Sequence, residues 1–419
     1  MPITPLPEHI AFVRAHSPFY RQLYRNLPKR PKWEELPVVD PSSFWRANHP
    51  ARNTVLTAPA SDALVLRSGG TTGAPKFSWW SAQEWRDFCH AFGHGLVDAG
   101  LAPGARVANL FYAGDLYASF TFILDSLAHC PIATTRFPFG GGLSPERLAH
   151  ALGEFRITTI AALPSTVITV AEHLVNMGDT LPEVELILVG GELLFGDRRP
   201  LLRAAFPHAR VQSVGYASVD AGLLGRPVRG DDLRKHQGWH PYTRTEILDE
   251  SGCPITQPGV PGTLVVTDLR RHLMPIVRYP AGDRAQWVDH EAGVFRLMGR
   301  AGDALRIAYV TMHVEDVHAA VATVDTDHEI AALQLVAVHR RGLDGLVLRA
   351  ATAHPDSPRA TALAHAIVEA VLRARPAYSE ATEHRQVLPL EVEWVHHRDL
   401  ATHPRSGKLL RVIDQRPLA

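Results

Sequence analysis

The sequence predicts an α/β protein: a large N-terminal domain of βα-built sheets with a small barrel-like layer, then a small mobile α+β C-terminal domain. Two patterns carry this prediction. Apolar runs alternate with helical patterns from about residue 62 to residue 218, and short strands separated by turn residues follow residue 240. The length of 419 residues favours more than one domain, because a single hydrophobic core rarely serves so long a chain.

The N-terminal domain, predicted as residues 1–298, begins with a helical pattern over 8–27 that Ser17-Pro18 interrupts, since proline removes a helix hydrogen bond. Strands are expected in ALVLRS and RVANLF and in the segments that begin TTIAAL, VELILV and ARVQSV. Helices are expected in AQEWRDFCHAFGHGLVDAG, DLYASFTFILDSLAHC and PSTVITVAEHLV. Such alternation is typical of parallel sheets covered on both faces.

Beyond residue 240 the pattern changes to short strands, RTEILDE, GTLVVTDL and FRLMGR, which favour a more antiparallel, barrel-like layer. The glycines of GRAGDA permit backbone rotation and mark a junction. The segment 299–419 that follows is predicted as the small domain. Its strands are EIAALQLVAVH and GLVLRAATA, and its helix is ATALAHAIVEAVLRAR.

Composition excludes several classes of protein. Lysine plus arginine and aspartate plus glutamate number 43 each, so net charge favours neither a nucleic-acid nor a membrane partner. Three cysteines without a Cys-x-x-Cys pair argue against a disulfide framework and a structural zinc site. No basic start with an apolar core predicts a signal peptide, and no run of about 18 apolar residues predicts a membrane span. We therefore expect a cytoplasmic protein.

A loop rich in glycine and hydroxyl groups follows the ALVLR strand. It reads Ser68-Gly69-Gly70-Thr71-Thr72-Gly73-Ala74-Pro75-Lys76. Glycine-permitted backbone angles can turn successive N–H groups toward an anion, while the threonine hydroxyls add donors and Lys76 adds charge. The loop fails the G-x-x-x-x-G-K-[ST] pattern, because Ala74 and Pro75 separate Gly73 from Lys76. By itself it fits both a phosphate-binding loop and a solvated turn.

The loop resembles the phosphate-binding motif of the adenylate-forming superfamily, and further segments resemble that family's motifs in the same order. They are Gly190-Gly191-Glu192, Tyr216-Ala217-Ser218-Val219-Asp220, Arg278-Tyr279-Pro280-Ala281-Gly282-Asp283, Gly299-Arg300-Ala301-Gly302-Asp303 and Arg405-Ser406-Gly407-Lys408. The SPFYR start and the phrase GTLVVTDLRRHLMPIVRYPAGD are similar to the phenylacetate–CoA ligase branch. The resemblance extends over nearly the whole chain.

The resemblance implies an enzyme that uses ATP and Mg²⁺ to convert a carboxylic acid into an acyl-adenylate. It implies that Lys408 is the catalytic lysine, bridging the substrate carboxylate and the α-phosphate, and that Asp220 binds the metal. Asp220 is one methylene shorter than the family's glutamate, so it is expected to reach the metal through water. The residues that the resemblance assigns to ATP or AMP are Ser68, Gly69, Gly70, Thr71, Thr72, Gly73, Lys76, Gly191, Glu192, Tyr216, Asp283 and Arg300.

The resemblance also implies a pocket for a small, aromatic acid. In this interpretation Tyr112 and Tyr117 flank the acid, and Gly190 and Ala217 leave room for it. Ordinary core packing is the alternative for the two tyrosines, and it is the commoner fate of aromatic residues.

The acceptor that the resemblance implies is coenzyme A. However, Tyr309 stands where relatives have a glycine along the path of the pantetheine arm, so transfer to an amine or a hydroxyl stays open. A non-catalytic nucleotide-binding homologue is a third interpretation, against which the retained Lys408 argues. The identity of the acid and the oligomeric state are left open by the sequence.

Overall fold

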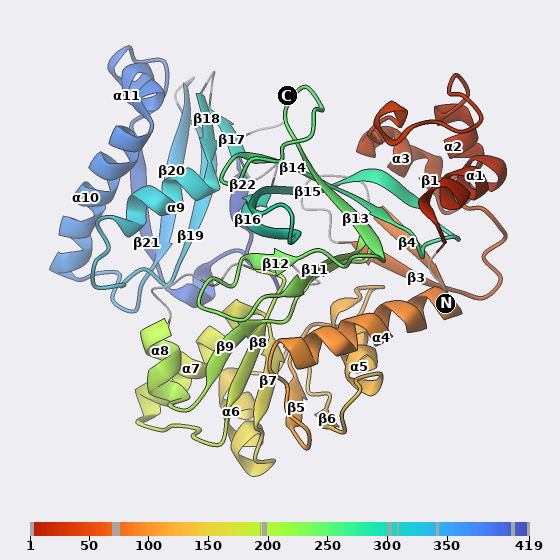
Figure 1. Ribbon diagram of the computed structural model, residues 1–419. Coiled ribbons are helices and arrows are strands. Elements are labelled where there is room, and N and C mark those ends of the chain that lie inside the picture. The colour runs from red at the N-terminus through yellow and green to blue at the C-terminus, as the bar shows by residue number, and fades with distance from the viewer. Residues whose placement is uncertain are drawn as a thin grey trace. The chain divides into compact units, whose positions relative to one another are not determined.

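The computed structural model describes residues 4–68, 76–192, 194, 199–300, 304–307, 310–340, 343–403 and 407–416, except for the side chains of Ser68, Arg300, Ala304, Arg306, Thr311 and His313. The chain divides into two compact units (Figure 1). The first comprises Met1–Leu194, Leu201–Met298 and Pro404–Gly407, and the second comprises Phe195–Pro200, Gly299–His403 and Lys408–Ala419. The predicted α/β class is confirmed. No helix within the described ranges is long and apolar enough to cross a membrane.

A parallel sheet lies at the centre of the first unit. Its described strands, in spatial order, are β6 (Thr135–Phe137), β5 (Arg106–Asn109), β7 (Thr159–Ala162), β8 (Leu186–Val189) and β9 (Arg210–Ser213). Helix α4 (Ala82–Asp98) precedes β5 in the chain. The helices between successive strands are α5 (Ser119–Ala128), α6 (Pro145–Glu154), α7 (Pro164–Met177) and α8 (Arg199–Ala205). The predicted alternation of strands and helices is present.

Side-chain alternation along these strands explains why helices cover both faces of the sheet. Val107 and Leu188 pack in one core with α4 and α5, while the adjacent Ala108 and Ile187 pack in another core with α6, α7 and α8. Successive residues of a strand point to opposite faces, so a fully apolar strand needs cover on both. Polar side chains can therefore gather only where the strands end.

An antiparallel sheet forms the barrel-like layer. Its described strands, in spatial order, are β10 (Tyr216–Ser218), β11 (Gly222–Pro227), β12 (Lys235–Gln237), β16 (Val294–Arg300), β15 (Ile276–Asp289), β14 (Pro261–Asp268) and β13 (Thr243–Leu248). Helices α1 (Leu6–His16), α2 (Pro18–Leu23) and α3 (Pro41–Ala47) share a core with this layer. The expected interruption at Ser17-Pro18 separates α1 from α2. The short elements η1 (Trp33–Glu35), β1 (Asn48–His49) and β2 (Arg52–Asn53) complete the N-terminal segment.

The glycine-rich loop connects two paired strands, which differs from the predicted passage directly into a helix. Strand β3 (Ala63–Ser68) pairs antiparallel with β4 (Lys76–Ser81), and Ser68 lies opposite Lys76 in the register. Helix α4 then begins at Ala82, where Ser81 and Glu84 form a reciprocal capping box. The segment KFSWWS was not predicted as a strand, because it is short and has few aliphatic residues. The pairing brings both ends of the loop to one point.

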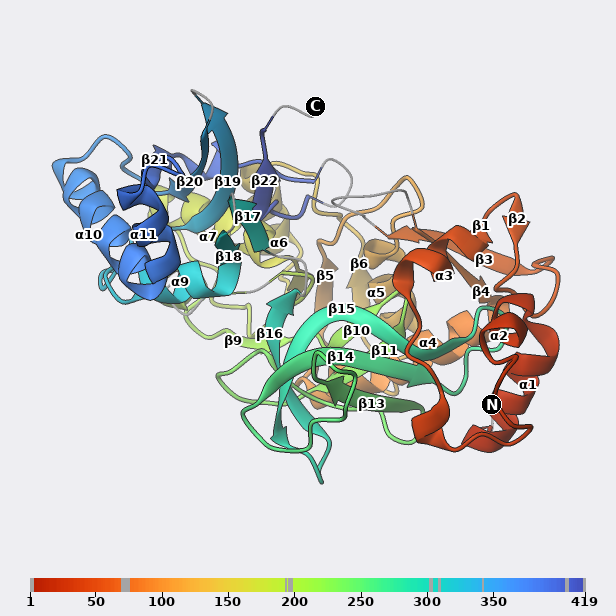
Figure 2. The same cartoon turned by 90° about the horizontal axis from the view of Figure 1, so that it is seen from above.

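The second unit is a small α+β structure. Its four described strands β21 (Glu391–Val395), β20 (Leu343–Ala351), β19 (Ala332–Arg340) and β22 (Val412–Asp414) form one sheet. Figure 2 shows α9 (Val314–Ala322), α10 (Pro358–Ala374) and α11 (Pro376–Glu383) beside this sheet, and their apolar side chains share its core. The hairpin of β17 (Ala304–Ile307) and β18 (Val310–His313) precedes α9, and η3 (His397–Asp399) precedes β22.

His9 on α1 is a buried histidine whose ring nitrogens have no hydrogen-bond partner within the described residues. Its ring centroid lies 5.3 Å from that of His272. Burial, with a smaller contribution from the charge of His272, lowers the pKa of His9 to about 3. At pH values between the ordinary pKa of histidine and this lowered pKa, the folded state binds fewer protons than the unfolded chain. Stability is therefore lost as the pH falls through this window.

We predict that His9→Phe reduces the acid sensitivity of the first unit. Between pH 7.5 and pH 5 the wild-type protein should lose about 2 kcal/mol more stability than the variant, because one pKa unit corresponds to about 1.4 kcal/mol. Guanidinium unfolding followed by tryptophan fluorescence measures this difference. His16→Phe, at an exposed position of the same helix, is the control and should keep the wild-type pH dependence. Equal pH dependence in wild type and His9→Phe would contradict the prediction.

Candidate nucleotide and acyl site

Residues of several predicted motifs follow directly after the parallel strands. Tyr112 comes shortly after β5, the Gly190-Gly191-Glu192 segment comes directly after β8, and Tyr216 comes shortly after β9. In open α/β sheets, ligands bind in the crevice outside the carboxyl ends of the strands. The arrangement of these segments therefore defines a candidate site at the carboxyl edge of the parallel sheet (Figure 1).

The predicted nucleotide residues Tyr216 and Asp283 meet in the structure. The Tyr216 hydroxyl donates a hydrogen bond to the Asp283 carboxylate, although the two residues come from separate motifs. The Tyr216 ring is half-buried, and its centroid lies 5.6 Å from that of the His236 ring. An aromatic face next to a carboxylate suits a ligand that carries a flat ring and hydroxyl donors, and a nucleoside has both.

His236 fixes the turn from which Tyr216 projects. Its Nδ1–H donates to the Arg234 carbonyl at 3.0 Å, so Nε2 accepts the hydrogen bond from the Ser213 hydroxyl, also at 3.0 Å. The Ser213 Oγ in turn accepts the Gly215 N–H at 3.1 Å. Burial lowers the pKa of His236 to about 4, which keeps the ring neutral at pH 7. The sequence carried no signal for this chain of hydrogen bonds, because its members come from separate strands.

Asp220, the predicted metal ligand, lies next to the strand that follows the glycine-rich loop. Its Oδ1 accepts a hydrogen bond from the Ser78 hydroxyl at 2.9 Å. The Asp220 carbonyl accepts from Arg271 Nη1 at 2.8 Å, and Arg271 Nη2 donates to the Trp79 carbonyl at 3.0 Å. One guanidinium therefore joins β4 to the segment that contains Tyr216 and Asp220.

The Arg271 side chain is 1% exposed, and its guanidinium lies 3.9 Å from the centroid of the Trp80 ring. Burial lowers the pKa of Arg271, while the carboxylates of Glu84, Asp268 and Asp220 oppose this shift. Glu84 is buried as well and accepts backbone N–H groups from His272 at 2.6 Å and Leu273 at 2.8 Å. Sequence reasoning missed Arg271, since nothing distinguishes it locally from its neighbour Arg270.

The donor set around Asp220 fits a magnesium ion that arrives with a nucleotide. Mg²⁺ takes one or two protein carboxylates when substrate phosphates supply further oxygens. Within the described ranges no group of three or more histidine, cysteine, aspartate or glutamate side chains is placed to hold a metal ion. Asp220 with Ser78 thus suits a phosphate-bound ion.

His90 and His94 form a histidine pair that sequence reasoning overlooked. They lie one turn apart on α4, and their ring centroids are 4.9 Å apart.

The Gly190-Gly191-Glu192 segment contacts two neighbouring elements. A Cβ at Gly190 would lie 2.5 Å from Val214 Cγ1, so only glycine allows this approach to the chain after β9. Gly191 has φ +82°, a left-handed conformation that favours glycine. The Glu192 Oε2 accepts the Ser165 N–H at 3.1 Å, at the first turn of α7. These contacts explain the conformation of the segment. They do not test its predicted contact with adenine, which stays a prediction.

The predicted acyl residues are arranged as follows. Tyr112 and Ala217 pack against the same hydrophobic core, and a Cβ at Gly141 would lie 2.6 Å from Tyr112 Cε2. Tyr117 lies in a turn in which its N–H donates to the Gly114 carbonyl at 2.8 Å. Residues 114–116 all have positive φ, so the predicted helix over 115–130 begins only at Ser119. The structure brings Tyr112 and Ala217 to one core and leaves Tyr117 in the turn.

Several predicted residues fall partly or wholly outside the described part of the chain. Gly69, Gly70, Thr71, Thr72, Gly73 and Tyr309 lie outside the described residues, as do the side chains of Ser68 and Arg300. Lys76 begins β4, and its Nζ lies 5.4 Å from the centroid of the Trp45 ring. The Lys408 carbonyl accepts the His403 N–H at 2.7 Å in a turn that pairs Thr402 with Leu409.

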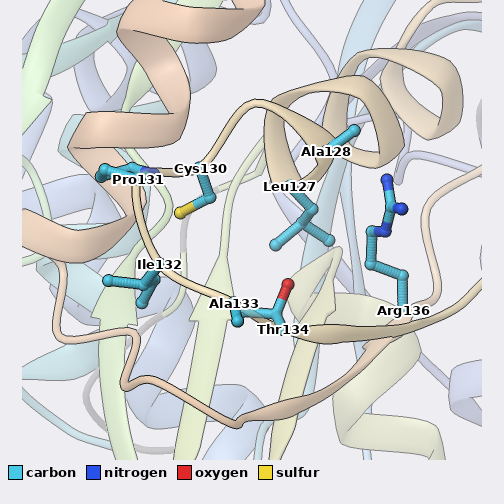
Figure 3. A pocket seen from close by; sticks show the side chains of 8 residues that line it. All are labelled: Leu127, Ala128, Cys130, Pro131, Ile132, Ala133, Thr134 and Arg136. Atoms are coloured by element: carbon cyan, nitrogen blue, oxygen red, sulfur yellow. The ribbon is translucent and has the colours of Figure 1, made fainter.

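A separate surface cavity of about 350 Å³ lies between the end of α5 and β6 (Figure 3). It is lined by Leu127, Ala128, Cys130, Pro131, Ile132, Ala133, Thr134 and Arg136. None of these residues belongs to a predicted motif. The Cys130 thiol donates to the Gly93 carbonyl, with Sγ and O 3.1 Å apart, and burial raises its pKa, so it is a packed side chain and not an activated thiolate.

Comparison with known proteins identifies relatives of similar sequence and of similar fold. No family model matches the chain. The phenylacetate–coenzyme A ligase of Thermus thermophilus is 26% identical over 369 residues, which cover 83% of this chain and 79% of that protein. The 2-hydroxyisobutyryl-CoA ligase in complex with 2-HIB-AMP superposes with a TM-score of 0.75 at 19% identity, covering 97% of this chain and 88% of that one. The chain is thus similar in sequence to phenylacetate–coenzyme A ligases and similar in fold to a CoA ligase.

The chain is similar to the phenylacetate–CoA ligase branch of the adenylate-forming superfamily, and the resemblance found in the sequence is confirmed. A second phenylacetate–coenzyme A ligase, from Aromatoleum evansii, is 26% identical over 263 residues, 60% of this chain and 57% of that protein. The amide bond synthetase McbA from Marinactinospora thermotolerans has a TM-score of 0.55 at 17% identity, covering 86% of this chain and 70% of that one. Solved structures similar in fold to this chain thus include both a CoA ligase and an amide bond synthetase.

We predict that Arg271→Met destabilises this protein by about 3 to 5 kcal/mol, because the buried carboxylates of Glu84 and Asp268 lose a nearby cation and backbone carbonyls lose their donor. Arg270→Met is the matched control: that guanidinium stacks on Tyr242 at 4.3 Å in a half-buried position, so its loss should cost much less. Denaturant unfolding of both variants measures the difference. Similar losses in the two would show that Arg271 has no special role.

Proposed function

We propose that this adenylate-forming protein is an ATP-dependent acid–thiol ligase. It activates a small carboxylic acid as an acyl-adenylate and then transfers the acyl group to coenzyme A. The observation that carries the proposal is the hydrogen bond between Tyr216 and Asp283, which brings two nucleotide motifs from distant parts of the sequence to one place. The similarity to two phenylacetate–coenzyme A ligases supports the same activity.

In the first half-reaction, a carboxylate oxygen attacks the α-phosphorus of ATP, and the bond to the departing pyrophosphate breaks. The Tyr216 ring packs against the base, and Asp283 accepts hydrogen bonds from the ribose hydroxyls. The paired ends of β3 and β4 hold the loop that binds the phosphates, with the Lys76 ammonium at its end. Lys408 bridges the substrate carboxylate and the α-phosphate, where fixed donors stabilise the developing charge. Asp220 would hold a magnesium ion, which would supply positive charge to neutralise the phosphates.

The acid that we propose is aromatic. Tyr112 and Ala217 pack against one core next to the carboxyl edge of the parallel sheet. Gly190 has no side chain and so takes up little space at that edge. A flat ring between aromatic and small side chains gains both area burial and stacking. Tyr117 belongs to the same proposed pocket through its turn, whose Leu116 carbonyl accepts the Arg67 N–H of β3 at 2.9 Å.

In the second half-reaction, the coenzyme A thiolate attacks the acyl carbonyl and AMP leaves. A second candidate acceptor, an amine or a hydroxyl compound, is favoured by the bulk of Tyr309 in the proposed pantetheine path and by the likeness in fold to an amide bond synthetase. The activation step is the same for both acceptors. A protein that only bound nucleotides would have no use for Lys408 in the small domain.

The activation step is tested by ATP–pyrophosphate exchange across a panel of small carboxylic acids. We predict that Lys408→Ala retains ATP binding but loses exchange by about 100- to 1000-fold, the loss typical of one preorganised donor. Lys29→Ala, at an exposed position remote in the sequence, is the matched control and should exchange normally. Near-normal exchange in Lys408→Ala would refute the catalytic assignment.

The acceptor is tested at Tyr309. If its ring narrows the path of the pantetheine arm, Tyr309→Gly should raise the rate of coenzyme A thioester formation and leave pyrophosphate exchange as it is. Both half-reactions are measured in wild type and variant with the same acid. Fast thioester formation by the wild-type protein, unimproved by the substitution, would assign coenzyme A as an ordinary acceptor and remove Tyr309 from its path.

A further inference from the structure

Helix α3 carries an aromatic side chain to the end of the glycine-rich loop. Trp45 lies in the last turn of α3, and Lys76 is the first residue of β4. The Lys76 ammonium lies 5.4 Å from the centroid of the Trp45 ring, within the range of a cation–π contact. No carboxylate of the described residues pairs with this ammonium. The ring therefore holds the lysine without neutralising its charge.

Two hydrogen bonds fix the segment that carries Trp45. The side-chain amide of Asn48, directly after α3, donates to the Phe77 carbonyl at 2.6 Å, and Asn48 is buried. The Trp45 indole N–H donates to the Tyr279 hydroxyl at 2.9 Å. Strand β1, which begins at Asn48, lies beside β4 (Figure 2). The position of the Trp45 ring next to Lys76 is therefore set by contacts with strands of two sheets.

The Tyr279 hydroxyl connects Trp45 to the strand that contains the proposed ribose contact. Tyr279 and Asp283 both belong to β15, and Asp283 accepts the hydrogen bond from the Tyr216 hydroxyl. Tyr279 is buried, and its ring packs against Phe44 of α3 with the two centroids 5.4 Å apart. One indole ring thus links the ammonium at the end of the glycine-rich loop to the strand that carries Asp283.

We propose that Trp45 is a positioning residue, which holds Lys76 ready to bind the phosphates of ATP. This inference rests on the part of the proposed function in which Lys76 contacts those phosphates. An ammonium has three N–H donors, so an ammonium held against a ring face keeps donors for phosphate oxygens. The lysine side chain is flexible, and restricting it before the ligand arrives reduces the entropy that is lost on binding.

The test measures the dissociation constant of Mg-ATP by calorimetry and the KM for ATP in pyrophosphate exchange. Trp45→Leu should raise both constants by about two- to fivefold, the effect of one cation–π contact, and leave kcat almost unchanged. Arg46→Ala, at an exposed position of the same helix, is the control and should keep both wild-type values. In the Lys76→Met background, Trp45→Leu should have no further effect, because Trp45 acts through the ammonium.

Two further variants keep the test independent of how well Trp45→Leu folds. Trp45→Met fills more of the space of the indole without an aromatic face, so it should show the same loss of ATP affinity. Trp45→Phe keeps an aromatic face and should recover most of the affinity that the other two variants lose.

Wild-type affinity for ATP in both Trp45→Leu and Trp45→Met would overturn the inference. An equal loss with Lys76 and with Lys76→Met would also overturn it, since Trp45 would then serve only the fold. Binding of ATP with the expected dependence on Trp45, but no exchange with any acid, would instead refute the proposed acid activation and leave the inference in place.

Discussion

The arrangement of the proposed nucleotide site depends on the hydrogen bonds of the buried Arg271 guanidinium. It donates to backbone carbonyls of two different sheets, at Trp79 of β4 and at Asp220 after β10. A planar guanidinium can serve several carbonyls at fixed angles, which a lysine ammonium on a flexible stem cannot do as well. Strand β4, which follows the glycine-rich loop, and the segment that contains Tyr216 and Asp220 are therefore joined by one side chain.

Burying this charge is costly, and the surrounding residues show how the cost is offset. Carboxylates of Glu84, Asp268 and Asp220 surround the cation, and the Trp80 ring covers its face. Glu84 also caps α4 through the Ser81 N–H at 2.9 Å and accepts two N–H groups from the chain after Arg271. One cluster thus joins the start of α4, strand β4 and Asp220, the proposed metal ligand.

The carboxyl edge of the parallel sheet provides the second constraint. Because helices cover both faces of the sheet, polar side chains gather where strands end, and successive strands contribute Tyr112, Thr166, Glu192 and Tyr216. The hydrogen bonds of His236 and Ser213 then orient the turn before Tyr216. In the proposed function, this edge holds the nucleotide at one place and the acid at another, and Gly190 leaves room between them.

The sequence by itself determined the helices and strands with clear periodicity, the break at Ser17-Pro18 and the family, because these depend on local patterns and on the order of motifs. It also indicated that Tyr216 and Asp283 serve one ligand. Only the tertiary structure placed Arg271 and His236, and only it revealed β4 between the glycine-rich loop and α4. These residues act through hydrogen bonds and charges between segments far apart in the chain, and no local pattern records which of several arginines or histidines will meet a distant partner.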